Sequence, residues 1–226
     1  MQNNNLKIIN IMLASVDGRI AFHRNESSSE RTKNHFTCTA DFERMRHLVA
    51  QCDVVFHGAH SIETEIGAFR VADLRHNKEE PEWIIFTRSG EISFQSPFWK
   101  QTGIPKSLFF VSSFNLSEEP ILKVEEKEFH FGTIKCLLGN VTGILDYLKN
   151  KGSKKAALLG GGKLNTAFWE NNLVDELYLT ISPVVIGAEE APQFVNSKSI
   201  LRSRLVLKKC EVKENFVFLD YAQKNG

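Results

Sequence analysis

Residues 157–171 read ALLGGGKLNTAFWEN, in which three glycines and a lysine separate an apolar run from a stretch with helical spacing. Backbone without side chains at Gly160, Gly161 and Gly162 lets a phosphate approach the amides at a helix start, where the helix dipole also favours an anion. The run matches neither G-x-G-x-x-G nor the G-K-[ST] ending of a triphosphate-binding loop. The glycines alone therefore indicate either a phosphate cradle beside Lys163 or a tight turn that packs a helix closely on its strand.

Small and polar residues also lie at the ends of three other expected strands: they are Asp17, Gly58 to Ser61, and Thr87, Arg88 and Ser89. A mainly parallel sheet binds ligands at the carboxyl ends of its strands, so these residues and the glycine run are expected to line one cleft. A dinucleotide fits this set, with its pyrophosphate at the glycines. Arg88 with Ser89 suits the 2′-phosphate of NADP, because a guanidinium binds phosphate in a bidentate manner. A solvated surface arginine is the alternative interpretation of Arg88.

Alternating apolar strands and amphipathic helices must position these loops. Strands are expected at 6–15, 52–58, 82–90, 107–113, 123–131, 154–160 and 176–187, with an antiparallel hairpin over 204–223. Helices are expected at 40–51, 60–67, 141–152 and 163–172, the first capped by Thr39 or Asp41. The polar stretch 22–37 has no apolar period and is expected to be a long loop. The order predicts a three-layer α/β fold with a mainly parallel central sheet and the antiparallel C-terminal hairpin at one edge, in a single domain over residues 1–226.

Composition argues against several classes of function. The 226 residues include 28 basic and 27 acidic ones, for a formal net charge of +1, so nothing general favours nucleic acid or an anionic membrane surface. No apolar run approaches the roughly 18 residues of a membrane span, and a soluble, cytoplasmic protein is expected. Four cysteines lie far apart with no C-x-x-C pair and no histidine at zinc spacing, which predicts reduced thiols and no metal site.

Three stretches of the chain carry a resemblance to a known family: SVDGRIA at 15–21, CDVVFHGAHSI at 52–62, and ALLGGGKLNTAFWENNLVDELYLTISPVVIGAEEAP at 157–192. The last is the most specific, because it combines the glycine loop, a helix, L-V-D-E-L, an apolar strand, and then Pro183 and Gly187 at the family spacing. On these motifs nearly the whole chain resembles the reductase domain of riboflavin biosynthesis, the 5-amino-6-(5-phosphoribosylamino)uracil reductases, whose fold is that of dihydrofolate reductase.

The resemblance implies NADPH as the cofactor, a small-molecule substrate, no metal and a homodimer. It also implies which residues line the cofactor cleft: Ala14, Gly58, Ser61, Arg88, Ser89, and Gly160 to Lys163. Asp17 would lie where the nicotinamide and the substrate meet.

Several positions that handle the substrate in this family differ here. Leu159 stands where the family has a glutamate, and Val49 stands where it has the arginine of Leu-Arg-Ala. Glu65-Ile66-Gly67 replace Asp-Asp-Pro, and His35 stands where tryptophan is common. No spacing selects among the three arginines that are candidates to replace the missing guanidinium: Arg44, Arg46 and Arg70.

Together these features predict an NADPH-dependent reductase that transfers hydride to a ribosylaminopyrimidine-type substrate, with candidate substrate-binding positions at Arg46, Glu65 and Leu159. The candidate proton donors are Asp17, His35 and Asp41. Each also has a structural interpretation, as a turn residue, a loop surface residue and a helix cap respectively, and a bound water is a further donor. Two alternative functions stay open. One is a reductase of dihydrofolate, a pterin or another small molecule on the same fold, and the other is a catalytically decayed protein that still binds NADPH.

Overall fold

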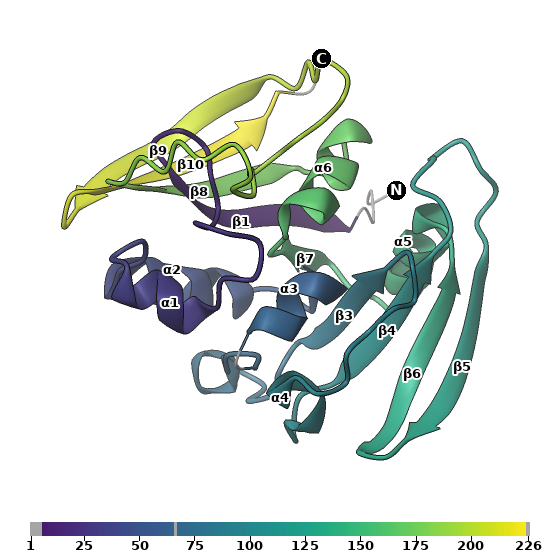
Figure 1. Ribbon diagram of the computed structural model, residues 1–226. Coiled ribbons are helices and arrows are strands. Elements are labelled where there is room, and N and C mark those ends of the chain that lie inside the picture. Colours follow the sequence, from purple (N-terminus) through teal and green to yellow (C-terminus); the bar gives the residue numbers. More distant parts are fainter. Residues whose placement is uncertain (1–5, 66, 225–226) are drawn as a thin grey trace.

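The computed structural model describes residues 6–65 and 67–224, in which ten strands form one sheet (Figure 1). The strand order is β5-β6-β4-β3-β2-β7-β1-β8-β10-β9. The strands are β1 Lys7–Ser15, β2 Val54–Gly58, β3 Glu82–Thr87, β4 Lys106–Val111, β5 Leu122–Phe129, β6 Gly132–Gly139, β7 Lys155–Leu158, β8 Glu176–Ser182, β9 Leu205–Lys213 and β10 Phe216–Gln223.

The strands from β6 to β8 run parallel, and the β9–β10 hairpin pairs antiparallel with β8, as predicted. The prediction of antiparallel strands at one edge only was wrong, because β5 pairs antiparallel with β6 at the opposite edge. Strand β6 was missed in the sequence. Its two-residue turn from β5, His130 and Phe131, lies inside an aromatic run and lacks an Asn-Gly or Asp-Gly signal.

Helices cover both faces of the sheet, which confirms the three-layer α/β arrangement (Figure 1). Buried residues of α5 and α6 pack on one face, and those of α2, α3 and α4 pack on the other. The helices are α1 Ser28–Lys33, α2 Thr39–Val49, α3 Ala59–Thr64, the short 3-10 helix Ala72–Leu74, α4 Pro97–Lys100, α5 Val141–Asn150 and α6 Gly162–Glu170.

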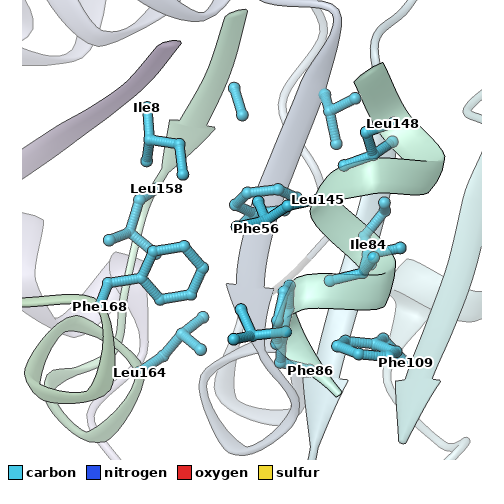
Figure 2. Close-up of a cluster of buried hydrophobic side chains, with 14 of the residues drawn as sticks. Ile8, Phe56, Ile84, Phe86, Phe109, Leu145, Leu148, Leu158, Leu164 and Phe168 are labelled. Carbon is cyan, nitrogen blue, oxygen red and sulfur yellow. The ribbon is translucent and has the colours of Figure 1, made fainter. Parts of the chain in front are cut away.

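Helix α6 is fixed on the sheet by an aromatic cluster, which matters because the glycine run lies at its start (Figure 2). The ring of Phe168 lies 5.6 Å from that of Phe56 on β2 and 5.8 Å from that of Phe86 on β3. Phe168 and Phe56 are fully buried, and burying one such side chain contributes about 1.5–3 kcal/mol. Trp169 also lies in this core, so both aromatic residues at the end of α6 pack against the sheet.

The polar stretch 22–37 is not wholly irregular, because it contains α1. Ser27 and Glu30 form a capping box that starts this helix, and none of its residues is buried. A helix without an apolar face leaves no period to detect, so the expectation of a loop was wrong for residues 28–33. The N-cap of α2 is Cys38, with no side-chain cap hydrogen bond, so Thr39 and Asp41 lie within the helix and the predicted caps are also wrong.

Candidate functional site

The carboxyl ends of the parallel strands bring the predicted loops together. The N–H of Gly58, at the end of β2, donates to the carbonyl of Gly160 at 2.8 Å. The first residues of α3 follow directly, so a Cβ built at Gly161 would lie 2.6 Å from the Ser61 hydroxyl. The structure therefore joins Gly58, Ser61 and the glycine loop, residues 160–162, into one wall of a site.

Each glycine of the loop has a steric reason to be glycine. Gly160 has φ +87°, which disfavours side chains, and a Cβ there would lie 3.1 Å from the Asn165 amide nitrogen. A Cβ on Gly162 would overlap the carbonyl oxygen of Gln193. The peptide between Gly160 and Gly161 is cis. The close-packed turn that the sequence suggested is therefore present.

The same loop also leaves amide donors free at the start of a helix. Within residues 6–65 and 67–224, the N–H groups of Gly161, Gly162 and Lys163 have no hydrogen-bond acceptor. They belong to the N-cap and first turn of α6, where the helix dipole adds favourable potential for an anion. The Lys163 side chain is exposed beside them. These groups suit the phosphates of a dinucleotide.

The loop after β3 presents an exposed arginine on a short turn. The buried Thr87 hydroxyl accepts a hydrogen bond from the Gly90 N–H at 3.0 Å, and the Ser89 hydroxyl accepts one from the Glu91 N–H at 3.2 Å. Both hydroxyls thus shape the turn. Arg88 is exposed and makes no ion pair with the described part of the chain, so its guanidinium is available to a ligand. Ala14 is buried near the end of β1.

Asp17 ties the turn after β1 to the loop after β8. Its carboxylate accepts hydrogen bonds from the N–H groups of Ile186 and Gly187, at 3.0 and 2.8 Å, and from the Ser15 hydroxyl at 2.7 Å. These donors hold the pKa of Asp17 far below its usual value. An ionised carboxylate committed to three donors does not supply a proton, so the structure favours the turn role over the catalytic role of Asp17.

The other two proton-donor candidates have different surroundings. His35 is exposed, with φ 54°, just after α1. Asp41 is a residue of α2 that is partly buried on the side facing β8. The hydroxyls of Thr180 and Thr37 donate to its carboxylate. Burial raises the pKa of Asp41, although these hydrogen bonds and the nearby Arg44 oppose the rise. The surroundings of Asp41 therefore favour its protonated form, whereas those of Asp17 favour the anion.

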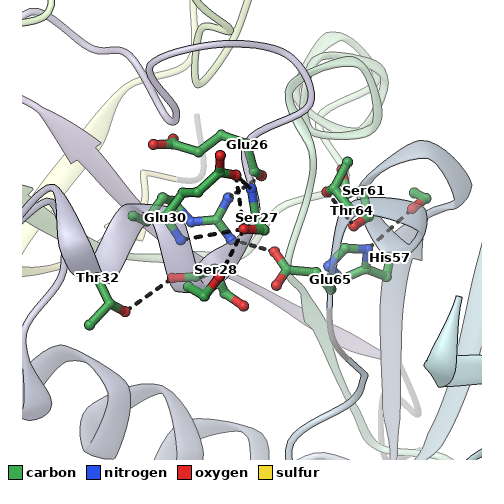
Figure 3. Close-up of polar contacts among 12 residues, drawn as sticks. Glu26, Ser27, Ser28, Glu30, Thr32, His57, Ser61, Thr64 and Glu65 are labelled. Atoms are coloured by element: carbon green, nitrogen blue, oxygen red, sulfur yellow. Dashed lines mark hydrogen bonds and ion pairs between the residues drawn. The ribbon is translucent and has the colours of Figure 1, made fainter.

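Glu65 lies beside a group that sequence reasoning missed. Its carboxylate forms an ion pair with Arg31 of α1, and it lies between the residues of α1 and the ring of His57 (Figure 3). Arg31 also donates to the carbonyl of Glu26 at 3.2 Å. Neither Arg31 nor His57 carried a sequence signal, because only the fold brings α1 against the end of α3. Ile66 lies outside the described residues.

The remaining substrate candidates behave differently from the prediction. Arg46 lies in the last turn of α2 and forms an ion pair with Asp73. This end of α2 lies near the amino ends of the parallel strands, whereas the glycine loop lies at their carboxyl ends. The structure therefore does not bring Arg46 to the site. The side chain of Leu159 packs against the apolar cluster on the α2 and α3 face. Arg44 and Arg70 are likewise engaged, with Asp220 and with the Thr102 carbonyl respectively.

Within the described residues, no helix is long and apolar enough to cross a membrane. The same residues contain no group of three or more side chains placed to bind a metal ion.

Comparison with known proteins identifies the class of this fold. A pyrimidine reductase-like protein from Corynebacterium diphtheriae superposes with a TM-score of 0.72 at 17% identity, covering 99% of this chain and 94% of the other. Dihydrofolate reductase from Enterococcus faecalis, complexed with NADP(H) and RAB-propyl, superposes with a TM-score of 0.54 at 13% identity, covering 97% of each chain. The fold is thus of the dihydrofolate reductase-like class.

The sequence defines the family more closely. Residues 6–218 match the family described as the RibD C-terminal domain, and the chain belongs to that family. The 2,5-diamino-6-ribosylamino-4(3H)-pyrimidinone 5′-phosphate reductase of Archaeoglobus fulgidus is 24% identical over 211 residues, which cover 89% of this chain and 88% of the relative.

The contacts of Asp17 predict an acid-dependent contribution to stability. Because its pKa is lower in the folded than in the unfolded state, the stabilisation is fully present above pH of about 4 and is lost as pH falls below that value. Asp17→Asn should therefore unfold more readily than the native protein at pH 7, and the difference should shrink at pH 3. Urea unfolding at both pH values measures it, and a constant difference would contradict the assignment.

Proposed function

We propose that this protein is an NADPH-dependent reductase that transfers hydride to a ribosylaminopyrimidine phosphate. The observation that carries the proposal is the set of free amides of Gly161, Gly162 and Lys163, held in a RibD C-terminal domain fold. The name of the archaeal relative supports the substrate class, and the NADP(H) of the structurally similar dihydrofolate reductase supports the cofactor.

The residues around the loop fit the parts of such a cofactor. The free amides of the first turn of α6 would hold the pyrophosphate, with the Ser61 hydroxyl beside the loop. Arg88, exposed at the end of β3, would bind the 2′-phosphate that distinguishes NADPH from NADH. When bound, the cofactor supplies the hydride, and the protein contributes orientation and proton management.

Asp41 is the group best placed to manage the proton. Its carboxyl lies at the start of α2, which faces β8 near the carboxyl edge of the sheet, and burial favours its neutral form. A neutral carboxyl donates a proton to a nitrogen or carbon that gains negative charge during hydride transfer. Arg44 holds Thr180 at 3.0 Å and so fixes one of the two hydroxyls that contact Asp41.

An assay of NADPH oxidation tests the whole proposal and its alternatives. Turnover is expected with the ribosylaminopyrimidine phosphate, while turnover only with dihydrofolate would instead establish a dihydrofolate-type reductase. Cofactor binding without turnover on either compound would support a decayed NADPH-binding protein. Failure to bind NADPH would contradict both the reductase and the binding-protein assignments.

Gly161→Asp should abolish NADPH binding. The new side chain would crowd the Ser61 hydroxyl and place a negative charge against the cofactor phosphates. Isothermal titration calorimetry measures the affinity. Gly132→Asp makes the same chemical change at the first residue of β6, where an added Cβ would have no neighbour within 4 Å; it is the matched control and should bind as the native protein does. Equal affinity of both variants would exclude the glycine loop as the phosphate site.

Asp41→Asn should lower kcat by about a hundredfold or more, the usual contribution of a positioned general acid. The affinity for NADPH should stay the same, because Asp41 does not contact the glycine loop. In the native protein kcat should fall as pH rises through the raised pKa of Asp41, and the variant should lack this decline. Asp146→Asn, on the exposed side of α5, is the control. An unchanged pH profile would assign the proton to bound water.

A further inference from the structure

Two fully buried asparagines lie beneath the glycine loop. Asn10 on β1 and Asn165 on α6 are both 0% exposed. A buried amide is costly unless its donors and acceptor are paired, so its partners show what it holds in place.

Asn165 lies in the first turn of α6 and contacts the glycine loop at the start of this helix. Its backbone N–H donates to the carbonyl of Gly161 at 3.0 Å. Its side-chain nitrogen lies 3.1 Å from the position that a Cβ on Gly160 would occupy, so the amide packs directly under the loop. The same nitrogen donates to the carbonyl of Phe194 at 3.3 Å. Asn165 thereby joins the loop to the segment whose Gln193 carbonyl lies against Gly162.

Asn10 connects Asn165 to the strand that precedes the loop. Its side-chain nitrogen donates to the Asn165 side-chain oxygen at 3.2 Å and to the carbonyl of Leu158, the last residue of β7, at 2.8 Å. Its side-chain oxygen accepts from the Trp169 indole N–H at 2.9 Å. The network therefore fixes the chain on both sides of the glycine run.

We infer that Asn165 is a positioning residue for the cofactor phosphates, supported by Asn10 and Trp169. It reaches no ligand itself, because it is fully buried under the loop. It acts by fixing the direction of the free amides of Gly161, Gly162 and Lys163. An apolar side chain in place of Asn165 would fill a similar volume but would leave the carbonyl of Phe194 without this donor and the side-chain nitrogen of Asn10 without one of its acceptors, and the loop amides would be held less firmly. This inference rests on the proposed cofactor site.

The test compares two buried asparagines. Asn140 is also 0% exposed, and its side chain holds the N–H groups of Gly143 and Ile121 and the carbonyl of Glu119, all remote from the glycine loop. Asn165→Ala and Asn140→Ala should both lower the melting temperature. Asn165→Ala should raise the Kd for NADPH, measured by isothermal titration calorimetry, by about tenfold, a change that corresponds to about 1.4 kcal/mol. Asn140→Ala should leave the Kd unchanged.

A milder variant covers the case in which Asn165→Ala does not fold. Trp169→Phe keeps an aromatic ring in the core and removes the indole N–H that Asn10 accepts together with part of the ring volume, and it should raise the Kd by roughly threefold. Hydrogen exchange in residues 158–164, measured without cofactor, should quicken in both network variants and not in Asn140→Ala.

The outcomes separate the inference from the proposed function. Native protein that fails to bind NADPH contradicts the proposed function, and the exchange measurement then decides the inference alone. Native affinity and native exchange in both network variants would overturn the positioning role. Equal weakening of binding by Asn165→Ala and Asn140→Ala would also overturn it, because the effect would then be one of general stability.

Discussion

The hydrogen bond from the Gly58 N–H to the Gly160 carbonyl is the contact on which the site depends. It joins the ends of β2 and β7, two neighbouring parallel strands, at 2.8 Å. The approach leaves so little room that a Cβ on Gly161 would crowd Ser61. A tight turn and a phosphate cradle are therefore not alternatives in this chain. The packing that requires glycine is the packing that exposes the amides of the α6 start, because no side chain shields them.

The carboxylates near the carboxyl edge divide into two kinds. Asp17 is held ionised by backbone donors of the loop after β8, and that loop continues to the segment 192–196, which hydrogen-bonds with the turn after β1 and with α6. Asp41 receives hydroxyl donors and is desolvated. Backbone and hydroxyl donors lower the pKa of Asp17, whereas burial raises the pKa of Asp41, so the surroundings favour a structural role for Asp17 and the neutral form of Asp41.

Sequence patterns predicted the parts of the molecule that depend on local chemistry. Apolar β-branched runs predicted every parallel strand except β6, and the small residues at the strand ends predicted the shared edge. Helix α1 has no apolar face, and the β5–β6 turn has no standard turn residues, so neither produced a local signal. Arg31 with Glu65, and Asn10 with Asn165, are pairs separated by 34 and 155 positions. These residues become neighbours only when the fold brings distant elements together, and no local sequence pattern predicts such contacts.

The surroundings of Leu159 are apolar and uncharged. Leu159 packs in an apolar cluster, and its strand neighbour His57 is buried, which lowers the pKa of the ring and keeps it neutral. The carboxyl ends of β2 and β7 therefore carry no charge at Leu159, the position where the resemblance to the riboflavin reductases predicts a glutamate. Arg31 and Glu65, the charged groups that act on His57, lie at the contact between α1 and α3 and form an ion pair. Helix α1 is held here by this ion pair and by its own capping box rather than by buried side chains. The end of α3 is therefore bordered by a polar helix that the sequence showed only as a loop.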